Sequence, residues 1–235
     1  MTRPLRVYIG YDRSETVAFH VAAHSVQMRA SLPVSVAGLI LPQLPLKRER
    51  DEMQSTDFAF TRFLVPWLCH YEGEAIFMDC DMLCRADIAE LFEIAGREMA
   101  AVSVVKHDYQ PSTQSKFLGH EQSRYQRKNW SSVMHFNCNA CRALTPEYID
   151  RAPGLELHQF DWVNGEIGSL PIEWNHLVGE YPPNPQAKLV HFTLGTPCFH
   201  RFSTCEFARE WYAERDQMLH YERLGEYSKP ERIEA

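Results

Sequence analysis

The chain has 235 residues, of which 45% are hydrophobic and 23% are charged, and 24 Lys and Arg against 31 Asp and Glu give a net charge of −7. These values are typical of a globular protein and exclude a disordered, collagen-like or coiled-coil chain. The negative net charge disfavours a general nucleic-acid binder, which needs a basic surface. The length predicts a single domain over residues 1–235.

Three features of the sequence bear on the cellular compartment. The longest apolar run, Val36–Leu41, stops at Pro42 and is far shorter than the roughly 18–20 apolar residues of a membrane span. The first residues lack the apolar core and the cleavage site of a signal peptide. Seven dispersed cysteines, an odd number, favour reduced thiols over a disulfide framework. We therefore expect a cytoplasmic protein without a transmembrane segment.

The first half of the chain alternates short apolar runs with helical patterns. In chain order it predicts a strand over Arg6–Ile9, a helix over Ser14–Met28, a strand over Val34–Leu41, a helix over Phe58–His70, a strand over Ala75–Met78 and a short helix from Asp87 through Phe92. Ser14 and Asp87 have the side chains of helix N-caps. Pro66 is expected to bend or shorten the helix that contains it.

The second half continues this alternation after a polar stretch. It predicts a strand over Ala100–Val105, a strand over Ser131–Phe136, a helix over Pro146–Arg151, a short helix over Asp161–Leu170, a strand over Leu189–Phe192 and a terminal helix over Cys205–Tyr221. Lys106–Asn129 predicts a long loop over a site. The whole pattern predicts an α/β fold with a mixed, mostly parallel sheet between helices.

Two carboxylates close the third predicted strand, in the tripeptide Asp79-Cys80-Asp81. Residues two apart in an extended chain project to the same face. At the carboxyl end of a strand, where open α/β sheets bind ligands, such a pair can share one hard divalent cation that bridges to a diphosphate. A pair of surface or capping aspartates is the plainer alternative, because the motif is short.

Read together with four other segments, this motif resembles a known enzyme family. The segments are Val7–Asp12 (VYIGYD), Phe60–Leu64 (FTRFL), Ala75–Asp81 (AIFMDCD), Trp174–Asn175 (WN) and Leu189–Gly195 (LVHFTLG). In order and spacing they resemble the family 8 glycosyltransferases over about residues 5–200. That group includes glycogenin and the bacterial lipopolysaccharide galactosyltransferases and has the GT-A fold, which the resemblance therefore implies here.

The resemblance implies a set of metal ligands. Asp79 and Asp81 would hold the metal and the diphosphate, and His191 would be the third protein ligand. Neutral imidazole suits Mn²⁺ better than Mg²⁺, so the implied cofactor is Mn²⁺ or, second, Mg²⁺.

The resemblance also implies residues that bind the donor. Tyr11 and Asp12 would face the nucleoside, and Arg62 would lie beside the nucleotide and the donor sugar. Gly195 would allow the backbone to approach the diphosphate closely. Asp161 matches an acidic position near the donor sugar and is the predicted catalytic residue.

The sequence departs from the family pattern in three places. Phe160 stands where some members carry a proposed glutamine nucleophile, so nothing supports a covalent double displacement through that side chain. The family's Asn-Ala-Gly-Val segment reads Trp130–Val133 (WSSV), and Gly195–Cys198 (GTPC) lacks the usual basic residue. The first departure favours front-face departure and attack at the sugar.

Each predicted site residue also has a plainer structural interpretation. His191 can be a core histidine, and Arg62 can be an ordinary salt-bridged residue. Asp161 can cap a helix that starts at Trp162, and Tyr11 and Asp12 can be turn residues.

A zinc site is a rival interpretation of the cysteines. Cys138 and Cys141 have zinc-ligand spacing, and Cys198, His200 and Cys205 follow later. The later trio does not match a familiar zinc knuckle, and small buried thiols are common at strand ends.

These observations predict a metal-dependent glycosyltransferase. The expected reaction moves a sugar from a nucleotide-sugar donor, most simply a UDP-sugar, to a hydroxyl acceptor, and the resemblance implies retention at the anomeric carbon. The acceptor can be a saccharide, a lipid-linked saccharide or a protein, and the loops of residues 106–130 would select it. One alternative is a non-catalytic nucleotide-binding protein with the same fold. The other is a sugar nucleotidyltransferase, which would carry a Gly-rich loop near the first strand. The segment Gly10–Ser14 (GYDRS) lacks the glycines of such a loop.

Overall fold

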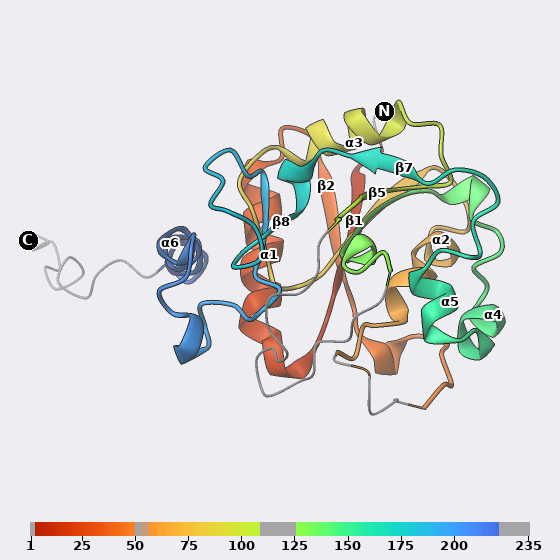
Figure 1. The fold of residues 1–235 in the computed structure, drawn as a ribbon, viewed down its shortest axis with the longest axis horizontal. Helices are drawn as coiled ribbons and strands as arrows, with labels where there is room; N and C mark the ends of the chain where they lie inside the picture. The colour runs from red at the N-terminus through yellow and green to blue at the C-terminus, as the bar shows by residue number, and fades with distance from the viewer. Residues whose placement is uncertain (1–2, 50–53, 55, 109–125, 221–235) are drawn as a thin grey trace, which may run out of the picture.

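A six-stranded mixed sheet forms the centre of the protein. The structure, a computed structural model, describes residues 3–49, 54, 56–108 and 126–220 (Figure 1). The spatial order of the strands is β2 (Val34–Leu39), β1 (Leu5–Gly10), β3 (Glu74–Met78), β6 (Val133–Asn137), β5 (Val102–Val105) and β7 (Gly168–Leu170). β1 runs parallel to β2 and β3, β5 runs parallel to β7, and β6 is antiparallel to both of its neighbours. The predicted mixed, mostly parallel α/β sheet is confirmed.

A second, smaller sheet brings two distant parts of the chain together. Its strands lie in the order β4 (Met82–Cys84), β9 (Leu189–His191) and β8 (His176–Leu177). β4 is antiparallel to β9, with Met82 opposite His191. Because β4 follows β3 after only three residues, this pairing carries the end of β9 to the carboxyl edge of the central sheet.

Helices cover both faces of the central sheet. Figure 1 shows α1 (Thr16–Arg29) on one side and α2 (Val65–Leu68), α4 (Pro146–Arg151) and α5 (Gly154–His158) on the other. The helix α3 (Ile88–Gly96) packs on β6 and β7, and α6 (Ala208–Met218) lies on the outer side of α1. Among the described residues, no helix is long and apolar enough to cross a lipid bilayer.

Two apolar clusters hold these layers together. The main core lies between the central sheet and its helices and contains buried side chains such as Val7, Ile76, Phe77 and Phe136. A smaller cluster includes Trp211 of α6 and packs against the second sheet. The buried carboxylate of Glu214 on α6 also accepts hydrogen bonds from two side chains of α1, so polar contacts add to this packing.

Several predicted helices and strands are confirmed, although they begin or end at other residues than predicted. One helix N-cap is also a different residue from the predicted one. The helix predicted over Ser14–Met28 begins at Thr16, and Asp12 rather than Ser14 caps the 3-10 turn that precedes it. Asp87 caps α3 as predicted, because its carboxylate accepts the Ala89 amide at 2.9 Å. The terminal helix is shorter than predicted, at Ala208–Met218, and most of the predicted loop, residues 109–125, lies outside the described residues.

The helix predicted over Phe58–His70 is only one turn of α-helix, α2, which follows a 3-10 turn over Thr61–Leu64. Pro66 stands in the first turn of α2, where its missing N–H costs nothing. The helix that contains Pro66 is therefore shorter than the apolar pattern alone indicates, as predicted.

The helix predicted over Asp161–Leu170 is wrong. This segment forms turns and then β7, which pairs with β5. Gly165 has φ +116°, a backbone conformation that ends a right-handed helix. The apolar residues of this segment, Trp162, Val163 and Ile167, pack against the main core from turns and not from a helix. The short elements β4, β8 and α5 were not predicted.

Candidate metal centre

The side chains of Asp79, Asp81 and His191 meet at the carboxyl edge of the central sheet. Each offers one ligand atom, and these atoms all lie within 4.8 Å of one another. His191 Nε2 is 3.3 Å from Asp81 Oδ1. Asp81 and His191 are buried, with 7% and 2% exposure, and Asp79 is partly buried. Two carboxylates and an imidazole are a suitable ligand set for a divalent cation such as Mn²⁺.

The backbone explains why these residues meet. Asp79 follows the last residue of β3, and its amide donates to Ser132 O at 2.9 Å. Asp81 precedes β4, and its carbonyl accepts the Phe192 amide at 2.9 Å, which continues the β4–β9 pairing. His191 therefore lies beside Asp81, although the two are far apart in sequence.

Asn175 fixes the orientation of the His191 ring. His191 Nδ1 is 2.9 Å from Asn175 Oδ1, and Asn175 Nδ2 donates to Ser132 Oγ at 2.8 Å. The second bond holds the amide oxygen toward the histidine, so the ring proton belongs on Nδ1. The lone pair of Nε2 then faces Asp81. A histidine that ligates a metal is usually held in this way by a partner on its other nitrogen.

Arg62 pairs with one of the two aspartates. Its Nη1 is 3.0 Å from Asp79 Oδ1 and donates to Ser131 O at 2.8 Å. The guanidinium lies 5.3 Å from the centre of the Phe58 ring and 4.9 Å from that of Phe77. With only 6% exposure, Arg62 is a buried cation held by a carboxylate, a carbonyl and two aromatic rings.

Two further carboxylates crowd the same region. Glu15 is 4% exposed and Asp12 is 6% exposed. Burial and then the charges of Asp81, Asp12 and Asp79 raise the pKa of the Glu15 carboxyl well above its usual value. One oxygen of Glu15, Oε1, is buried and has no hydrogen-bond partner among the described residues. The negative charge gathered here favours a cation.

The residues predicted to bind the nucleoside and the diphosphate follow the carboxyl ends of β1 and β9, and local contacts hold them. Asp12 accepts hydrogen bonds from the amide and hydroxyl of Ser14 and from the Asp57 amide. Tyr11 Oη is 3.0 Å from Thr16 Oγ1. Gly195 has φ +144° in the turn after β9, a conformation that favours glycine. The turn-residue interpretation of Asp12 therefore describes its contacts in the structure.

Asp161 is placed differently. It is exposed and follows α5, where its amide donates to Glu156 O. Burial, then the hydrogen bond to Glu156 and the charges of Glu156 and Asp161 raise the pKa of Tyr148 on α4. The described contacts connect Asp161 to this helical surface and not to the three metal-ligand candidates. Phe160, by contrast, is 2% exposed and packs in the main core.

Sequence reasoning missed three polar residues of the site. Asn175 stands in the WN segment of the family resemblance, which gave it no role. Glu15 follows the first strand, but it belongs to no sequence motif that indicates a functional site. His107, which is 5% exposed, lies near His191, and burial and then the charge of His191 lower its pKa to about 3. No local pattern in the sequence indicates this position.

The zinc interpretation of the cysteines is not supported. Cys138 and Cys141 are buried in the main core, Cys205 packs against the second cluster, and Cys198 is exposed. Within the described ranges, the one group of three candidate ligands that come together is Asp79, Asp81 and His191. All seven cysteines are free thiols in the structure.

Similarity to solved structures identifies the fold. The chain superimposes on the bifunctional glycosyltransferase WbbM with a TM-score of 0.61 at 13% identity, and on GlyE of Streptococcus pneumoniae with 0.60 at 12%. It covers 52% of the WbbM chain and 63% of the GlyE chain, with 94% of its own length in both cases. The galactosyltransferase LgtC gives 0.52 at 11% identity, over 91% of this chain and 96% of LgtC. The protein therefore has the GT-A fold.

One curated relative shows the family. The chain is 40% identical over 245 aligned positions to Protein CDI of Arabidopsis thaliana, and the match covers 99% of this chain and 91% of that protein. The chain therefore belongs to the same family as Protein CDI. No protein-family model matches it.

Proposed function

We propose that this chain is a metal-dependent glycosyltransferase that moves a sugar from a UDP-sugar to a hydroxyl acceptor. The observation that carries the proposal is the convergence of Asp79, Asp81 and His191 at the carboxyl edge of a GT-A sheet. Ligands of open α/β sheets bind at this edge. Membership of the family 8 type, with retention at the anomeric carbon, is part of the proposal and derives from the segment resemblance.

The residues present fit a divalent cation. Burial and then the charges of Asp81, Asp12 and Asp79 raise the pKa of Glu15, so these aspartates supply negative charge to the site, and Asn175 presents the imidazole lone pair of His191 toward Asp81. Mn²⁺ suits this mixed oxygen and nitrogen ligand set. When bound, the cation would offset the charge of the departing diphosphate.

The chain's own residues would place the donor around that cation. We propose that Tyr11 and Asp12 face the nucleoside and that the Gly195 turn lets the backbone approach the diphosphate. Thr196, next in the chain, has a buried hydroxyl without a hydrogen-bond partner among the described residues, so it can donate to a phosphate oxygen. Arg62 would hold the Asp79 carboxylate in place through its 3.0 Å ion pair.

The donor class is proposed from both the resemblance and a structural neighbour. LgtC, which shares the fold, is a galactosyltransferase whose structure contains donor and acceptor sugar analogs. A similar donor here would place its sugar next to the metal-ligand candidates. The identity of the sugar and of the acceptor depends on contacts from residues 106–130, most of which lie outside the described residues.

The chemistry at the donor sugar is proposed from two neighbouring residues, Phe160 and Asp161. The buried Phe160 has no group that can attack an anomeric carbon, so front-face departure and attack is the proposed course. Asp161 remains the proposed acidic residue that acts on the sugar, as the resemblance implies. The variant Asp161→Asn tests this role, since strongly reduced turnover with unchanged UDP binding would support it. Wild-type turnover would remove Asp161 from the mechanism.

A thermal-shift screen of nucleotide-sugars tests the function. The purified protein is heated with UDP-, GDP- and CMP-sugars, with and without Mn²⁺, and the stabilising donor is then assayed for hydrolysis and transfer. A ligand at a hundredfold excess over its Kd stabilises by about 2.7 kcal/mol. We expect one UDP-sugar to stabilise only with Mn²⁺ and to be turned over. Mn²⁺-dependent UDP binding without turnover would instead support the non-catalytic alternative.

A further inference from the structure

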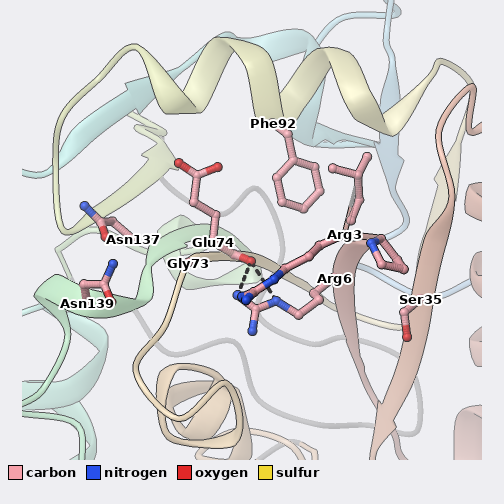
Figure 2. Close-up of a pocket in the computed structure, with 10 residues that line it drawn as sticks. Arg3, Arg6, Ser35, Gly73, Glu74, Phe92, Asn137 and Asn139 are labelled. Carbon is pink, nitrogen blue, oxygen red and sulfur yellow. Dashed lines mark hydrogen bonds between the residues drawn. The ribbon is translucent and has the colours of Figure 1, made fainter. Parts of the chain in front are cut away.

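A cavity opens at the opposite end of the central sheet from the metal-ligand candidates. It has a volume of about 680 Å³ and lies at the amino ends of β1 and β3, beside the carboxyl end of β6. Figure 2 shows the polar side chains that line it from four segments of the chain. Its lining includes Arg3, Arg6, Glu74, Phe92, Asn137 and Asn139.

The guanidinium group of Arg6 is held rigidly in this cavity. Its Nε and Nη2 donate to Glu74 O at 3.1 and 2.8 Å, and Nη2 also donates to Glu72 O. Its Nη1 has no hydrogen-bond acceptor among the described residues. Gly73, with φ +65°, permits this close packing, because a Cβ there would lie 2.9 Å from Arg6 Nη2. Arg6 therefore presents an oriented N–H edge whose position needs no further ordering.

The cavity is lined by two cations and one carboxylate, and the carboxylate forms an ion pair with neither cation within the described ranges. Within the described ranges, neither Arg3 nor Arg6 forms an ion pair. The carboxylate that could pair with them, Glu74, lies instead 3.6 Å from Nε2 of the buried His135. Figure 2 shows the Glu74 carboxylate directed toward the helix that carries Phe92 and away from the arginine head groups.

Neutral hydrogen-bonding groups complete the lining. The amide side chains of Asn137 and Asn139 have no hydrogen-bond partner in the described part of the chain, and Ser35 adds a hydroxyl. Phe92 supplies an apolar wall. Guanidinium groups bind phosphate and carboxylate oxygens through paired, charge-assisted hydrogen bonds, and amides can donate to the same oxygens.

We propose that this cavity is a binding site for a small molecule that carries an oxyanion, either a phosphate or a carboxylate. Arg3 and the free N–H edge of Arg6 bind the anion, and Asn137 and Asn139 donate to it or to its polar substituents. The volume is sufficient for a small metabolite.

The oxyanion site is separate from the proposed diphosphate site. β1 runs from Leu5 at the cavity to Gly10 at the carboxyl edge, and five residue steps of a strand span about 16 Å. An anion held by Arg3 therefore does not reach Asp79 or His191. The proposal stands whether or not the chain transfers sugars.

Titration calorimetry of the metal-free protein tests the proposal. Inorganic phosphate and citrate are the two probes, at constant ionic strength set with NaCl, and they distinguish the phosphate from the carboxylate source. We expect saturable binding of at least one probe. Arg3→Gln and Asn139→Ala should each weaken it by at least about fivefold, because each removes a hydrogen-bond donor to a charged group. Arg209→Gln, which removes the same charge from the exposed face of α6, should bind as the wild type does.

Nuclear magnetic resonance locates the bound anion. The side-chain amide signals of Asn137 and Asn139 and the Nε signal of Arg6 should shift on titration, with the same affinity that calorimetry gives. Asp81→Ala should leave these shifts unchanged. The proposal is overturned if neither probe binds saturably, or if Arg3→Gln binds as tightly as the wild type. Loss of binding in Asp81→Ala alone would also overturn it, because the anion would then occupy the other end of the sheet.

Discussion

The two ends of the central sheet carry opposite arrangements of charge. At the carboxyl end, four carboxylates lie near one another, one of them pairs with a buried arginine, and the Asn175 amide orients the histidine. At the amino end, two arginines share a cavity in which the carboxylate turns away to a histidine. One end therefore has a surplus of acceptors and negative charge, and the other has a surplus of donors and positive charge.

This difference shows how one sheet can offer two kinds of site. Parallel strands begin at one edge and end at the other, so residues before and after the same strands are sorted to opposite ends. Arg6 is the second residue of β1 and Asp12 follows that strand, just as Glu74 starts β3 and Asp79 follows it. We expect a cation to bind at the carboxyl end and an anion at the amino end.

The largest expected effect comes from removing a metal-ligand candidate at the carboxyl end. Asp81→Ala and His191→Ala should each lower Mn²⁺-dependent turnover of the donor by at least about a hundredfold. Loss of a residue that only orients a metal ligand typically costs about 10–100-fold, and loss of the ligand itself should cost more. The measurement is initial rate against Mn²⁺ concentration. Asp81→Ala should not lower the melting temperature, since it relieves repulsion among carboxylates.

The exposed His200 provides a matched control for the histidine variant. His200→Ala should turn over the donor at the wild-type rate. Normal turnover in His191→Ala, with normal dependence on Mn²⁺, would contradict a metal-binding role for this end of the sheet.

The next largest effect should come from the residue that orients His191. Asn175→Ala leaves the imidazole free to rotate and should weaken Mn²⁺ binding by about 10–100-fold. Asn175→Asp keeps an acceptor for His191 Nδ1 and should recover part of the affinity. Calorimetric titration with Mn²⁺ measures both variants. Equal loss in the two would show that Asn175 matters for packing and not for the orientation of the ring.

The sequence predicts the strands better than the pairing between distant segments. β1, β3 and Asp79-Cys80-Asp81 are readable because apolar runs and the two acidic residues are local patterns. The role of Asn175 and the opposition of Met82 and His191 depend on the β4–β9 register, which no local pattern encodes.

The wrong prediction over Asp161–Leu170 has the same physical cause. Parallel pairing of β7 with β5 is a long-range interaction, and it overrides the helical spacing of the apolar residues. The oxyanion cavity also could not be predicted, because Arg3, Glu74 and Asn139 come from three separate segments that only the folded sheet brings together.

A smaller effect is expected on the pH dependence of stability. Burial and then the charges of Arg62 and Arg48 lower the pKa of His158 to about 3. An unfolded histidine titrates near 6.5, so below that pH the unfolded state binds a proton that the folded state does not, and stability falls with acid. His158 should contribute about 1–2 kcal/mol of this loss at pH 5.

Urea unfolding at pH 7 and pH 5 measures the contribution of His158. The variant His158→Gln should lose less stability than the wild type over this interval, whereas His200→Gln should lose the same amount. If His158→Gln and the wild type show the same dependence on pH, the histidine is not held neutral beside Arg62.

The smallest effect should be the coupling between the two ends. The change in unfolding free energy of the double variant Asp81→Ala/Arg3→Gln should equal the sum of the single changes within about 0.5 kcal/mol, because the sites are separated by the length of β1. A larger coupling would mean that the two ends form one connected site.

Binding of Mn²⁺ itself tests the central claim most directly. The electron paramagnetic resonance signal of free Mn²⁺ falls when the ion binds, so titration counts bound ions without any assumption about the donor or acceptor. We expect one Mn²⁺ per chain in the wild type, tighter binding when UDP is present, and neither effect in His191→Ala. Equal Mn²⁺ binding by the wild type and His191→Ala would contradict the assignment of Asp79, Asp81 and His191 as the metal centre.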